Sequence, residues 1–445
     1  MTLFLWLLGG DFAFIFFETI FSQFIPLYLK ELNASNVLIG VAMGSVAGFA
    51  NIFFLPRISR WSDRYRSRWG RRIPFLFIAA PITSGLLIFI GFVPEVGGWL
   101  FSHFFQIFFP TLTKGEVVLG LLSLSIIFYH FFNMILVNAF NWLVRDVVPQ
   151  FTIARFMSWF KVVGTVSSCL FLWYVFPHVL VYRKEVCLAV GLTYLSIFMV
   201  MCFRVKEGEY PPPSLESENP GIFRSFVTYF RECLKVPKHR HFFIAYTLVT
   251  AATSCATPFL LLFAKETLKL DMTILGRAGT FGGIAALVCY MGMGWLCDKV
   301  NPINVMRAGL LGTATMMMGG YFMLHDQKSW IIFSVLNTIP TVAWALGSIA
   351  VGIRLFPKEK FGQFSSGLSV FGFGGLVFFN FLMGKWMDVS GDHYRYVFIW
   401  SFVLFSLALI FMGRVYEEDQ KELNIAANEN REEAPFSSSG VALTK

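Results

Sequence analysis

Two acidic residues inside one long apolar segment are the first groups in this sequence that could carry out chemistry. Asp11 and Glu18 both lie in the apolar run at 9–30. On a helix their carboxyl groups lie within roughly 20° of each other, with Ser22 roughly 40° further round. A carboxyl group at such depth is a candidate for loading and releasing a proton. We predict this role for Glu18, and for Asp11 unless the helix N-terminus alone accounts for its position.

A second polar stripe lies in the apolar run at 116–144. His130 is near the centre of that run, with Asn141 within roughly 20° of the same face and Asn133 roughly 60° away. An imidazole titrates near neutral pH, so His130 is a second candidate for proton coupling. The alternative is a buried histidine that bonds to a neighbouring backbone.

The C-terminal half offers amides and hydroxyls instead of charges. When the two halves are aligned on Pro26 and Pro258, Thr250 is the residue that corresponds to Glu18. One further stripe at helical spacing contains Asn337, Thr341, Trp344 and Ser348. An aromatic ring beside amides and hydroxyls suits a polyol, although Ser and Thr side chains also join helices to one another.

Composition indicates the elements that must position these residues. Of 445 residues, 56% are hydrophobic and only 14% are charged, whereas soluble domains carry about 25% charge. A soluble enzyme is therefore excluded. The fold class that we predict is an all-α membrane protein with twelve transmembrane helices. The expected spans are 9–30, 37–57, 73–94, 116–144, 152–177, 185–204, 241–264, 273–297, 302–323, 329–353, 362–387 and 395–414.

Several other classes lack support. The net charge of +9 does not indicate nucleic-acid binding, because the basic residues sit at span ends. The seven cysteines show no spacing typical of a disulfide or zinc framework. No phosphate-binding glycine loop or nucleophile elbow is present, so ATP-driven transport and hydrolysis are not indicated. We expect no enzyme activity and no cofactor.

Basic residues set the expected orientation. Most of the 36 Lys and Arg residues fall in loops on one side, above all in the loop after the second span, so both termini should be cytoplasmic. The expected location is the plasma (inner) membrane, and the protein should be a monomer. An internal repeat supports two six-helix halves, since Pro26, Asp63 and Pro149 have counterparts at Pro258, Asp298 and Pro357.

The repeat divides the chain into four parts. We expect an N-terminal half at 1–204, a linker at 205–240, a C-terminal half at 241–414 and a disordered tail at 415–445. Within the linker, Phe223, Phe226, Val227, Phe230 and Leu234 recur at helical spacing with basic residues opposite. This pattern predicts an amphipathic helix on the membrane face.

The loop after the second span carries the most specific motif, Ser59-Arg-Trp-Ser-Asp63-Arg-Tyr-Arg-Ser-Arg-Trp-Gly70-Arg-Arg-Ile-Pro74-Phe. Asp63 can accept hydrogen bonds from a neighbouring helix N-terminus, Gly70 permits a tight reversal, and arginines can pair with carboxylates or lipid phosphates. The alternative is a purely topological anchor. The predicted gating residues are Asp63, Arg64, Gly70, Arg71, Arg72, Asp146 and Arg354.

This motif resembles the loop after helix 2 in the glycoside–pentoside–hexuronide cation symporters, and most of all the sucrose–proton type, whose pattern Pro56 also matches. Leu143-Val-Arg-Asp146 resembles the end of helix 4 in that family. The resemblance implies a major facilitator fold in which helices 1, 4, 7 and 10 line a central cavity, so Glu18 and His130 could approach each other. It also implies a sugar-class substrate moved with a cation.

The sequence departs from that family at three positions. Asn51 and Leu55 stand where sodium-coupled members carry Asp, and a sugar-contacting Asp of helix 4 falls at Asn138 or Asn141. Protons are therefore the expected coupling ion. The full set of predicted substrate-binding residues is Ser22, Asn133, Asn138, Asn141, Thr250, Ser254, Asn337, Thr341 and Trp344.

The favoured function is proton-coupled symport of a sugar or glycoside by alternating access within the lipid bilayer. A carrier of amphiphiles such as lysolipids is the first alternative, and the 53 phenylalanines are compatible with it. A membrane sensor that has lost transport is the second, because of the departures from the family pattern.

Overall fold

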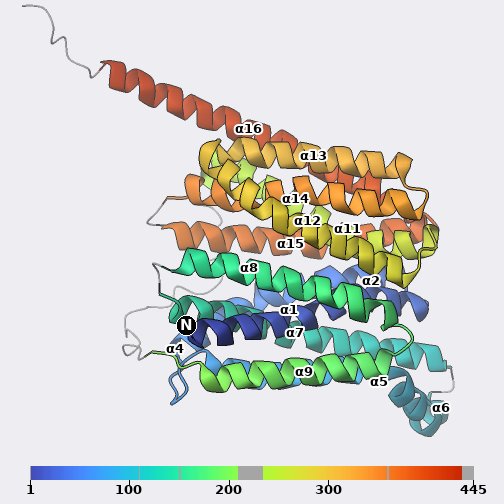
Figure 1. Cartoon of the computed structure of the whole chain (residues 1–445). Coiled ribbons are helices and arrows are strands. Elements are labelled where there is room, and N and C mark those ends of the chain that lie inside the picture. The colour runs from blue at the N-terminus through green and yellow to red at the C-terminus, as the bar shows by residue number, and fades with distance from the viewer. Residues whose placement is uncertain (1, 110, 150–151, 209–233, 358–359, 433–445) are drawn as a thin grey trace, which may run out of the picture.

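A computed structural model describes residues 2–109, 111–149, 152–208, 234–357 and 360–432. Helices account for nearly all of the regular structure in these ranges, and they run side by side (Figure 1). The predicted amphipathic helix of the linker falls at 223–234, which lies almost wholly outside the described residues.

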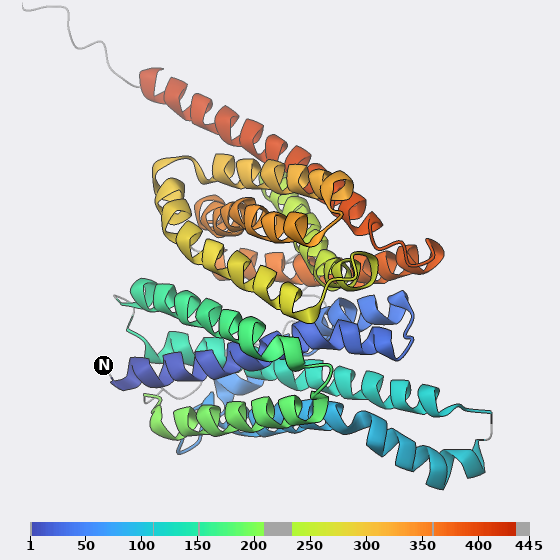
Figure 2. The ribbon, with the colours of Figure 1, turned by 45° about the vertical axis from the view of Figure 1, so that its right-hand side comes forward.

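The helices form two layers that follow the chain order. The first layer contains α1 (Thr2–Glu31), α2 (Asn36–Gly40), η1 (Val41–Ser45), α3 (Val46–Phe53), α4 (Leu55–Arg64), α5 (Ile73–Leu100), η2 (Phe101–Phe105), α6 (Gln106–Phe108), α7 (Lys114–Val147), α8 (Ile153–Leu170), η3 (Phe171–Val175), η4 (Phe176–His178) and α9 (Arg183–Arg204). The second contains α11 (Pro237–Leu262), η5 (Phe263–Thr267), α12 (Met272–Lys299), α13 (Pro302–Met323), α14 (Gln327–Leu355), α15 (Phe361–Val389) and α16 (Tyr396–Glu432). Figures 1 and 2 show the first layer below the second.

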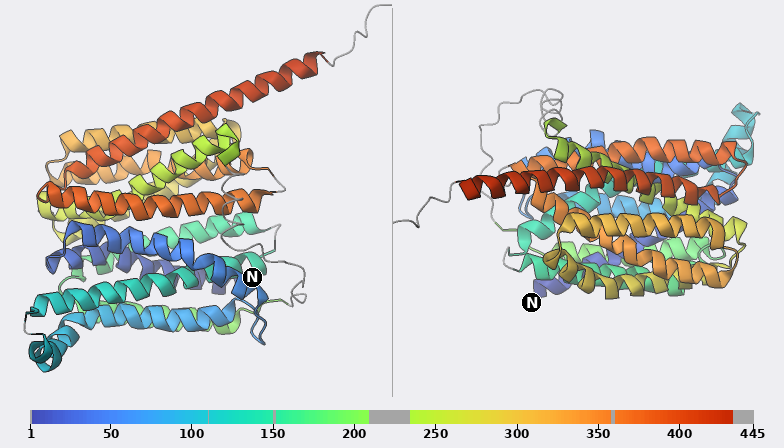
Figure 3. Two further views of the ribbon diagram at one scale, coloured as in Figure 1. Left: turned by 180° about the vertical axis from the view of Figure 1, so that it is seen from behind. Right: turned by 90° about the horizontal axis from the view of Figure 1, so that it is seen from above.

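The molecule has two ends, which we name by their residues. The basic end holds the N-terminus, α4 and the loop at 65–72, and lies on the left in Figure 1. The far end holds α6 and the connection at 32–35, where α1 leads into α2. The rear view in Figure 3 shows that α16 extends past the other helices at the basic end.

Polar residues begin the helices where the sequence leaves an apolar run. Thr113 and Glu116 form a reciprocal capping box at the start of α7, and Asp326 forms one with Ser329 at the start of α14. Asp271 accepts a hydrogen bond from the backbone N–H of Thr273 at the start of α12. Such caps satisfy N–H groups that have no partner within the helix, so they fix where each helix begins.

The predicted fold class is confirmed, and the span count is close. Eleven helices of the described chain are long and apolar enough to cross a membrane. The remaining predicted span, 302–323, coincides with α13, which falls outside that set and is rich in small residues. Gly309 and Gly312 of α13 lie against α14, where an added Cβ would meet Trp344 and Pro340. Small residues allow such close helix packing within a membrane.

Two predicted boundaries were wrong. The second span ends at Phe53, and α4 then forms a separate helix that starts beside Pro56, because proline cannot continue the preceding helix. The third apolar helix passes the expected end at 94 and continues through η2 and α6 to Phe108. Apolar and aromatic residues persist through that stretch, so the long helical segment extends beyond the neighbouring spans at the far end (Figure 2).

The tail was also predicted incorrectly over part of its length. Residues 415–432 continue α16 as a helix and are not disordered, whereas 433–445 lie outside the described residues. Charge pairing explains the difference. Asp419 of α16 pairs with Arg354 of α14 at 2.8 Å and with Lys238 of α11 at 3.8 Å, and Lys238 also pairs with Glu422. These ion pairs hold the polar C-terminal part of α16 against α11 and α14.

Candidate functional site

Glu18 lies partly buried in the middle of α1 and receives hydrogen bonds from α7. The Asn133 Nδ2 atom donates to Glu18 Oε2 at 3.0 Å, and the Tyr129 hydroxyl lies 3.4 Å from the same oxygen. The Tyr129 ring is stacked on Phe21 with centroids 3.7 Å apart, which restricts where its hydroxyl can reach. Both donors are neutral, so the carboxylate is held by hydrogen bonds that do not require a cationic partner.

His130 does not meet Glu18, and that prediction was wrong. The His130 Nε2 atom hydrogen-bonds to the Ala42 backbone oxygen at 2.7 Å, within the π-helical turn η1. Successive residues on a helix point roughly 100° apart, so only one of Tyr129 and His130 can face α1 at Glu18. The ring nitrogen must donate to that carbonyl, which makes His130 a link between α7 and the second span.

Asp11 is fully buried between α1 and α8. Neither of its carboxylate oxygens has a hydrogen-bond partner in the structure. A Cβ added at Gly164 of α8 would lie 3.4 Å from Asp11 Oδ2, so Gly164 leaves room for this carboxyl group. Lys161, one turn earlier on α8, is within electrostatic range of Asp11. Sequence reasoning missed Lys161, although a lysine inside an expected span is itself a signal.

The hydroxyls named as substrate ligands mostly bond to their own helices. Ser22, Thr250 and Thr341 each donate to a backbone oxygen three or four residues earlier. Ser254 instead accepts from the Asn380 Nδ2 atom of α15 at 3.2 Å. Each of these hydroxyl oxygens keeps a lone pair that can accept a further hydrogen bond.

The amides and the indole leave atoms without partners. Asn138 and Asn141 donate to backbone oxygens four residues earlier. The Asn133 Oδ1, Asn337 Oδ1 and Trp344 Nε1 atoms are buried and have no hydrogen-bond partner in the described structure. Because buried polar atoms are almost always paired, these three are candidates for contacts with a bound polar molecule. The Trp344 ring lies beside Phe405 of α16, with ring centroids 6.4 Å apart.

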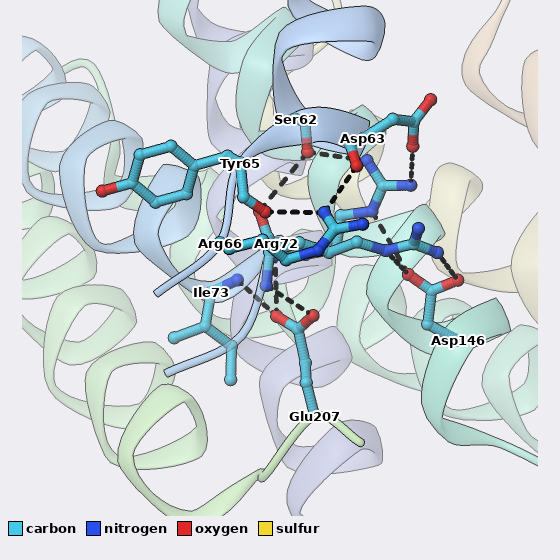
Figure 4. Close-up of polar contacts among 9 residues, drawn as sticks. Ser62, Asp63, Tyr65, Arg66, Arg72, Ile73, Asp146 and Glu207 are labelled. Carbon is cyan, nitrogen blue, oxygen red and sulfur yellow. Dashed lines mark hydrogen bonds and ion pairs between the residues drawn. The ribbon is translucent and has the colours of Figure 1, made fainter. Parts of the chain in front are cut away.

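The basic end carries a network of ion pairs (Figure 4). Arg71 binds Asp146 of α7 with two hydrogen bonds of 3.1 and 2.8 Å, and Arg72 binds the same carboxylate at 3.2 Å. Arg72 also donates to Ser62 Oγ at 2.6 Å and to Asp63. The network therefore ties α4, the start of α5 and the end of α7 together within the first layer.

One prediction about this network was wrong. The acceptor at the helix N-terminus is not Asp63, which pairs with Arg72, but Glu207. Glu207 accepts from the backbone N–H groups of Arg71, Arg72 and Ile73 at 2.9, 2.8 and 2.7 Å. Arg354, which the repeat makes the counterpart of Asp146 at the end of α14, pairs with Asp419 in the second layer. The ion pairs thus brace each layer at the basic end.

Gly70 has the predicted role in the turn. Its backbone has φ of +106°, a conformation that residues with a Cβ rarely adopt. A Cβ at this position would also meet the Glu207 side chain. Gly70 therefore lets the backbone turn close enough for Glu207 to reach the first N–H groups of α5.

We predict that Glu207→Ala will lower the free energy of unfolding by about 1–2 kcal/mol, because three N–H groups at the start of α5 lose their acceptor. Thermal unfolding of the purified protein measures this loss. Glu207→Gln is the matched control, since it keeps a side-chain oxygen of the same reach and should lose less. An Ala variant as stable as the original chain would contradict the proposed cap.

Comparison with known families identifies the chain. The sequence profile described as MFS/sugar transport protein matches residues 8–352. The chain belongs to this family. It is a multi-pass membrane transporter of the major facilitator kind. No curated protein sequence matches the chain.

Solved transporter structures share the fold of this MFS protein. A bacterial homologue of the iron transporter ferroportin, inward-facing, is 15% identical with a TM-score of 0.65, covering 93% of this chain and 98% of its own. A mutant of the nucleoside transporter NupG is 12% identical with a TM-score of 0.68, and the match covers 93% of this chain and 99% of its own. A bacterial homologue of the human lysosomal transporter Spinster is 14% identical with a TM-score of 0.68, and the match covers 94% of this chain and 98% of its own. At such identities the likeness establishes the fold alone.

The two halves of this MFS transporter are joined at the far end. The Asp388 carboxylate of α15 accepts from the backbone N–H groups of Asn36 and Val37 at 2.7 and 3.0 Å, at the start of α2. Lys30 pairs with Asp392 at 2.9 Å, and the Tyr394 hydroxyl donates to Asn36 Oδ1 at 2.9 Å. Sequence reasoning gave no signal for these contacts, because they join residues more than 350 positions apart.

The far-end contact of the transporter should persist in mild acid. Burial raises the pKa of Asp392, but hydrogen bonds from Lys30 and Asn36 outweigh it and hold that pKa below its ordinary value. A carboxylate with a lowered pKa contributes stability above its ordinary pKa and loses it only as the pH falls through the lowered value. A change of pH near neutrality should therefore leave the contact between Lys30 and Asp392 intact.

Close backbone packing extends the far-end contact of the two halves toward the membrane centre. Added Cβ atoms at Gly40 and Gly44 would collide with Asn380, and one at Gly384 would collide with Asn36. Ser45 Oγ donates to the Val377 backbone oxygen at 2.8 Å in the same interface. The transporter is thus closed at the far end by α2, η1 and α15.

Proposed function

We propose that this transporter is a secondary active carrier that moves a sugar or glycoside together with protons by alternating access. The observation that carries the proposal is Glu18, a carboxyl group at mid-span whose hydrogen-bond donors, Asn133 and Tyr129, are both neutral. An ionised carboxylate without a cation is costly inside a membrane, so a change in its surroundings can favour protonation. Asp11, buried without hydrogen bonds, is the second candidate for this step.

The proposed substrate class rests on the donors and acceptors near the spans' centres. A sugar presents hydroxyl groups that both donate and accept. Asn133 Oδ1 and Asn337 Oδ1 could accept from such hydroxyls, and Trp344 Nε1 could donate to one. The family description, which names sugar transport, supports the same class. Ser22, Asn138, Asn141, Thr250, Ser254 and Thr341 complete the proposed set.

The proposed cycle alternates between the two ends. The far end is closed by contacts between α2 and α15, so the structure supports access from the basic end. Opening the far end requires Asp388 to release the N–H groups of Asn36 and Val37. Proton binding at Glu18 shifts the equilibrium between the closed and the open far end if Glu18 binds the proton with different affinity in these two states.

The direct test is uptake into proteoliposomes that hold the full-length protein. A panel of monosaccharides, disaccharides and glycosides is compared with nucleosides and lysolipids, with and without a more acidic exterior. We expect at least one sugar or glycoside to enter faster under the acid gradient, and a protonophore should remove that gain. Uptake of a lysolipid or nucleoside without any sugar uptake would refute the proposed substrate class.

We also propose that the basic end faces the cytoplasm of a cell whose plasma (inner) membrane holds the protein. Arg57, Arg60 and Arg68 lie exposed at that end, and basic residues are retained on the cytoplasmic side. An epitope tag inserted at 95–115 should be accessible from outside intact cells, whereas tags at 205–220 and at the C-terminus should not. Labelling of the 205–220 tag from outside would overturn this orientation.

A further inference from the structure

The structure divides the seven arginines at 57–72 into two groups. Arg71 and Arg72 turn toward the protein and bind Asp146. The other five, which are Arg57, Arg60, Arg64, Arg66 and Arg68, are exposed. The ion pairs with Asp146 need only the first group. Within the second group, the exposed side chains of Arg57, Arg60 and Arg68 can contact a partner outside the protein.

The helix α4 presents its arginines on one face. Ile58 and Ser62 are buried one turn apart and pack toward the protein. Helical geometry places Arg57, Arg60, Arg64 and Trp61 within roughly 100° of arc on the other side. Asp63 is the carboxylate of α4, and it is paired with Arg72. The outward face of α4 therefore carries net positive charge.

Indole rings lie among these arginines. Trp61 is 61% exposed and packs edge-on against Phe75, with ring centroids 4.9 Å apart. Trp69 is 46% exposed, and the Arg68 guanidinium lies 4.8 Å from its ring centroid. A site for a soluble anion gains nothing from exposed indoles. A lipid headgroup region does, because tryptophan is enriched where hydrocarbon meets water.

The position of α4 along the span matches that region. The preceding span runs from Asn36 to Phe53, and its 18 residues extend about 27 Å, close to the roughly 30 Å of a bilayer's hydrocarbon core. The helix is interrupted at Phe54 and α4 begins at Leu55, so a span of this length places α4 where the hydrocarbon core ends. Its arginines therefore lie at the depth of phospholipid phosphates.

We propose that α4 and the loop at 65–69 form a binding surface for anionic phospholipid of the membrane leaflet at the basic end. Guanidinium groups of Arg57, Arg60 and Arg68 bind the lipid phosphate and the charged headgroup, while Trp61 and Trp69 lie against the upper acyl chains. Buried Ser62 and half-exposed Asp63 of α4 both contact Arg72, so a bound lipid also steadies the ion-pair network.

Native mass spectrometry of the full-length protein in detergent tests this surface without any transport assay. The protein is titrated with phosphatidylglycerol and, separately, with phosphatidylcholine of the same acyl chains. We expect phosphatidylglycerol to bind at least ~10-fold more tightly. The triple variant Arg57→Gln, Arg60→Gln, Arg68→Gln should lose that preference to within about twofold, because each guanidinium contributes to the attraction.

Two further variants separate charge from folding. Arg57→Lys, Arg60→Lys, Arg68→Lys keeps the charge and should keep most of the preference. Arg155→Gln, Arg240→Gln, Arg414→Gln removes three exposed arginines elsewhere at the basic end and should leave it unchanged. An unchanged preference in the α4 glutamine variant, or an equal loss in the control, would overturn the assignment. Displacement of the lipid by millimolar glycerol phosphate would also overturn it, in favour of a site for soluble phosphate esters.

Discussion

Replacing Glu18 by Gln is expected to abolish uphill, pH-driven accumulation of substrate while leaving exchange of substrate across the membrane intact. The glutamine side chain has the shape of the protonated carboxyl group but cannot release a proton. Exchange of substrate for substrate needs no deprotonation, so it should continue. Proteoliposomes loaded with unlabelled substrate measure exchange, and liposomes with an acid exterior measure accumulation.

Matched variants show whether Glu18 itself carries the proton. Asn133→Ala removes a neutral donor that holds Glu18 and should shift the pH dependence of accumulation without abolishing it. His130→Ala should mainly lower stability, since His130 bonds to Ala42 and not to Glu18. Normal accumulation by the Glu18→Gln protein would refute the assignment and move it to Asp11 or to uncoupled transport.

Replacing Arg72 by Ala is expected to have the largest effect on stability. The Arg72 side chain is 6% exposed and serves Ser62, Asp63 and Asp146. Without Arg72, Asp63 loses its cation, Ser62 loses its donor and Asp146 keeps Arg71 alone, which should lower the free energy of unfolding by about 2 kcal/mol. Transport should slow by at least ~10-fold, because α4, α5 and α7 lose their common contact.

Arg354→Ala is the control for that experiment. Arg354 pairs with one carboxylate, Asp419, and its side chain is 34% exposed. The expected loss of stability is below about 1 kcal/mol. Thermal unfolding and initial uptake rates measure both variants. Equal losses of stability and uptake rate in the two variants would show that the Arg72 network contributes no more than the single ion pair of Arg354.

The apolar runs and the polar residues between them predicted where the helices lie, but not which side chains of different helices contact one another. The span at 302–323 coincides with α13, and that at 185–204 ends where α9 ends. Contacts across helices depend on rotation about each axis, which hydrophobicity alone does not specify. The carboxylate of Glu18 was expected to meet His130, yet Tyr129 and Asn133 reach it.

Long-range polar contacts were the main omission. Glu207 follows α9 by three residues and serves N–H groups 134–136 positions earlier, so no local pattern announces it. Asp388 reaches α2 across the two halves in the same way. Residues 415–425 of α16 have the polar, acidic composition of a disordered tail. The pairing of Asp419 with Arg354 and Lys238 explains why they are helical.

Proton-coupled transport is measured most directly as substrate-dependent proton movement. Full-length protein in lightly buffered liposomes receives substrate without an imposed pH gradient, and the external pH is recorded. We expect the exterior to become more alkaline as a sugar or glycoside enters, and we expect the Glu18→Gln protein to give no such change while still exchanging substrate. Substrate entry without any change in external pH would contradict proton-coupled transport.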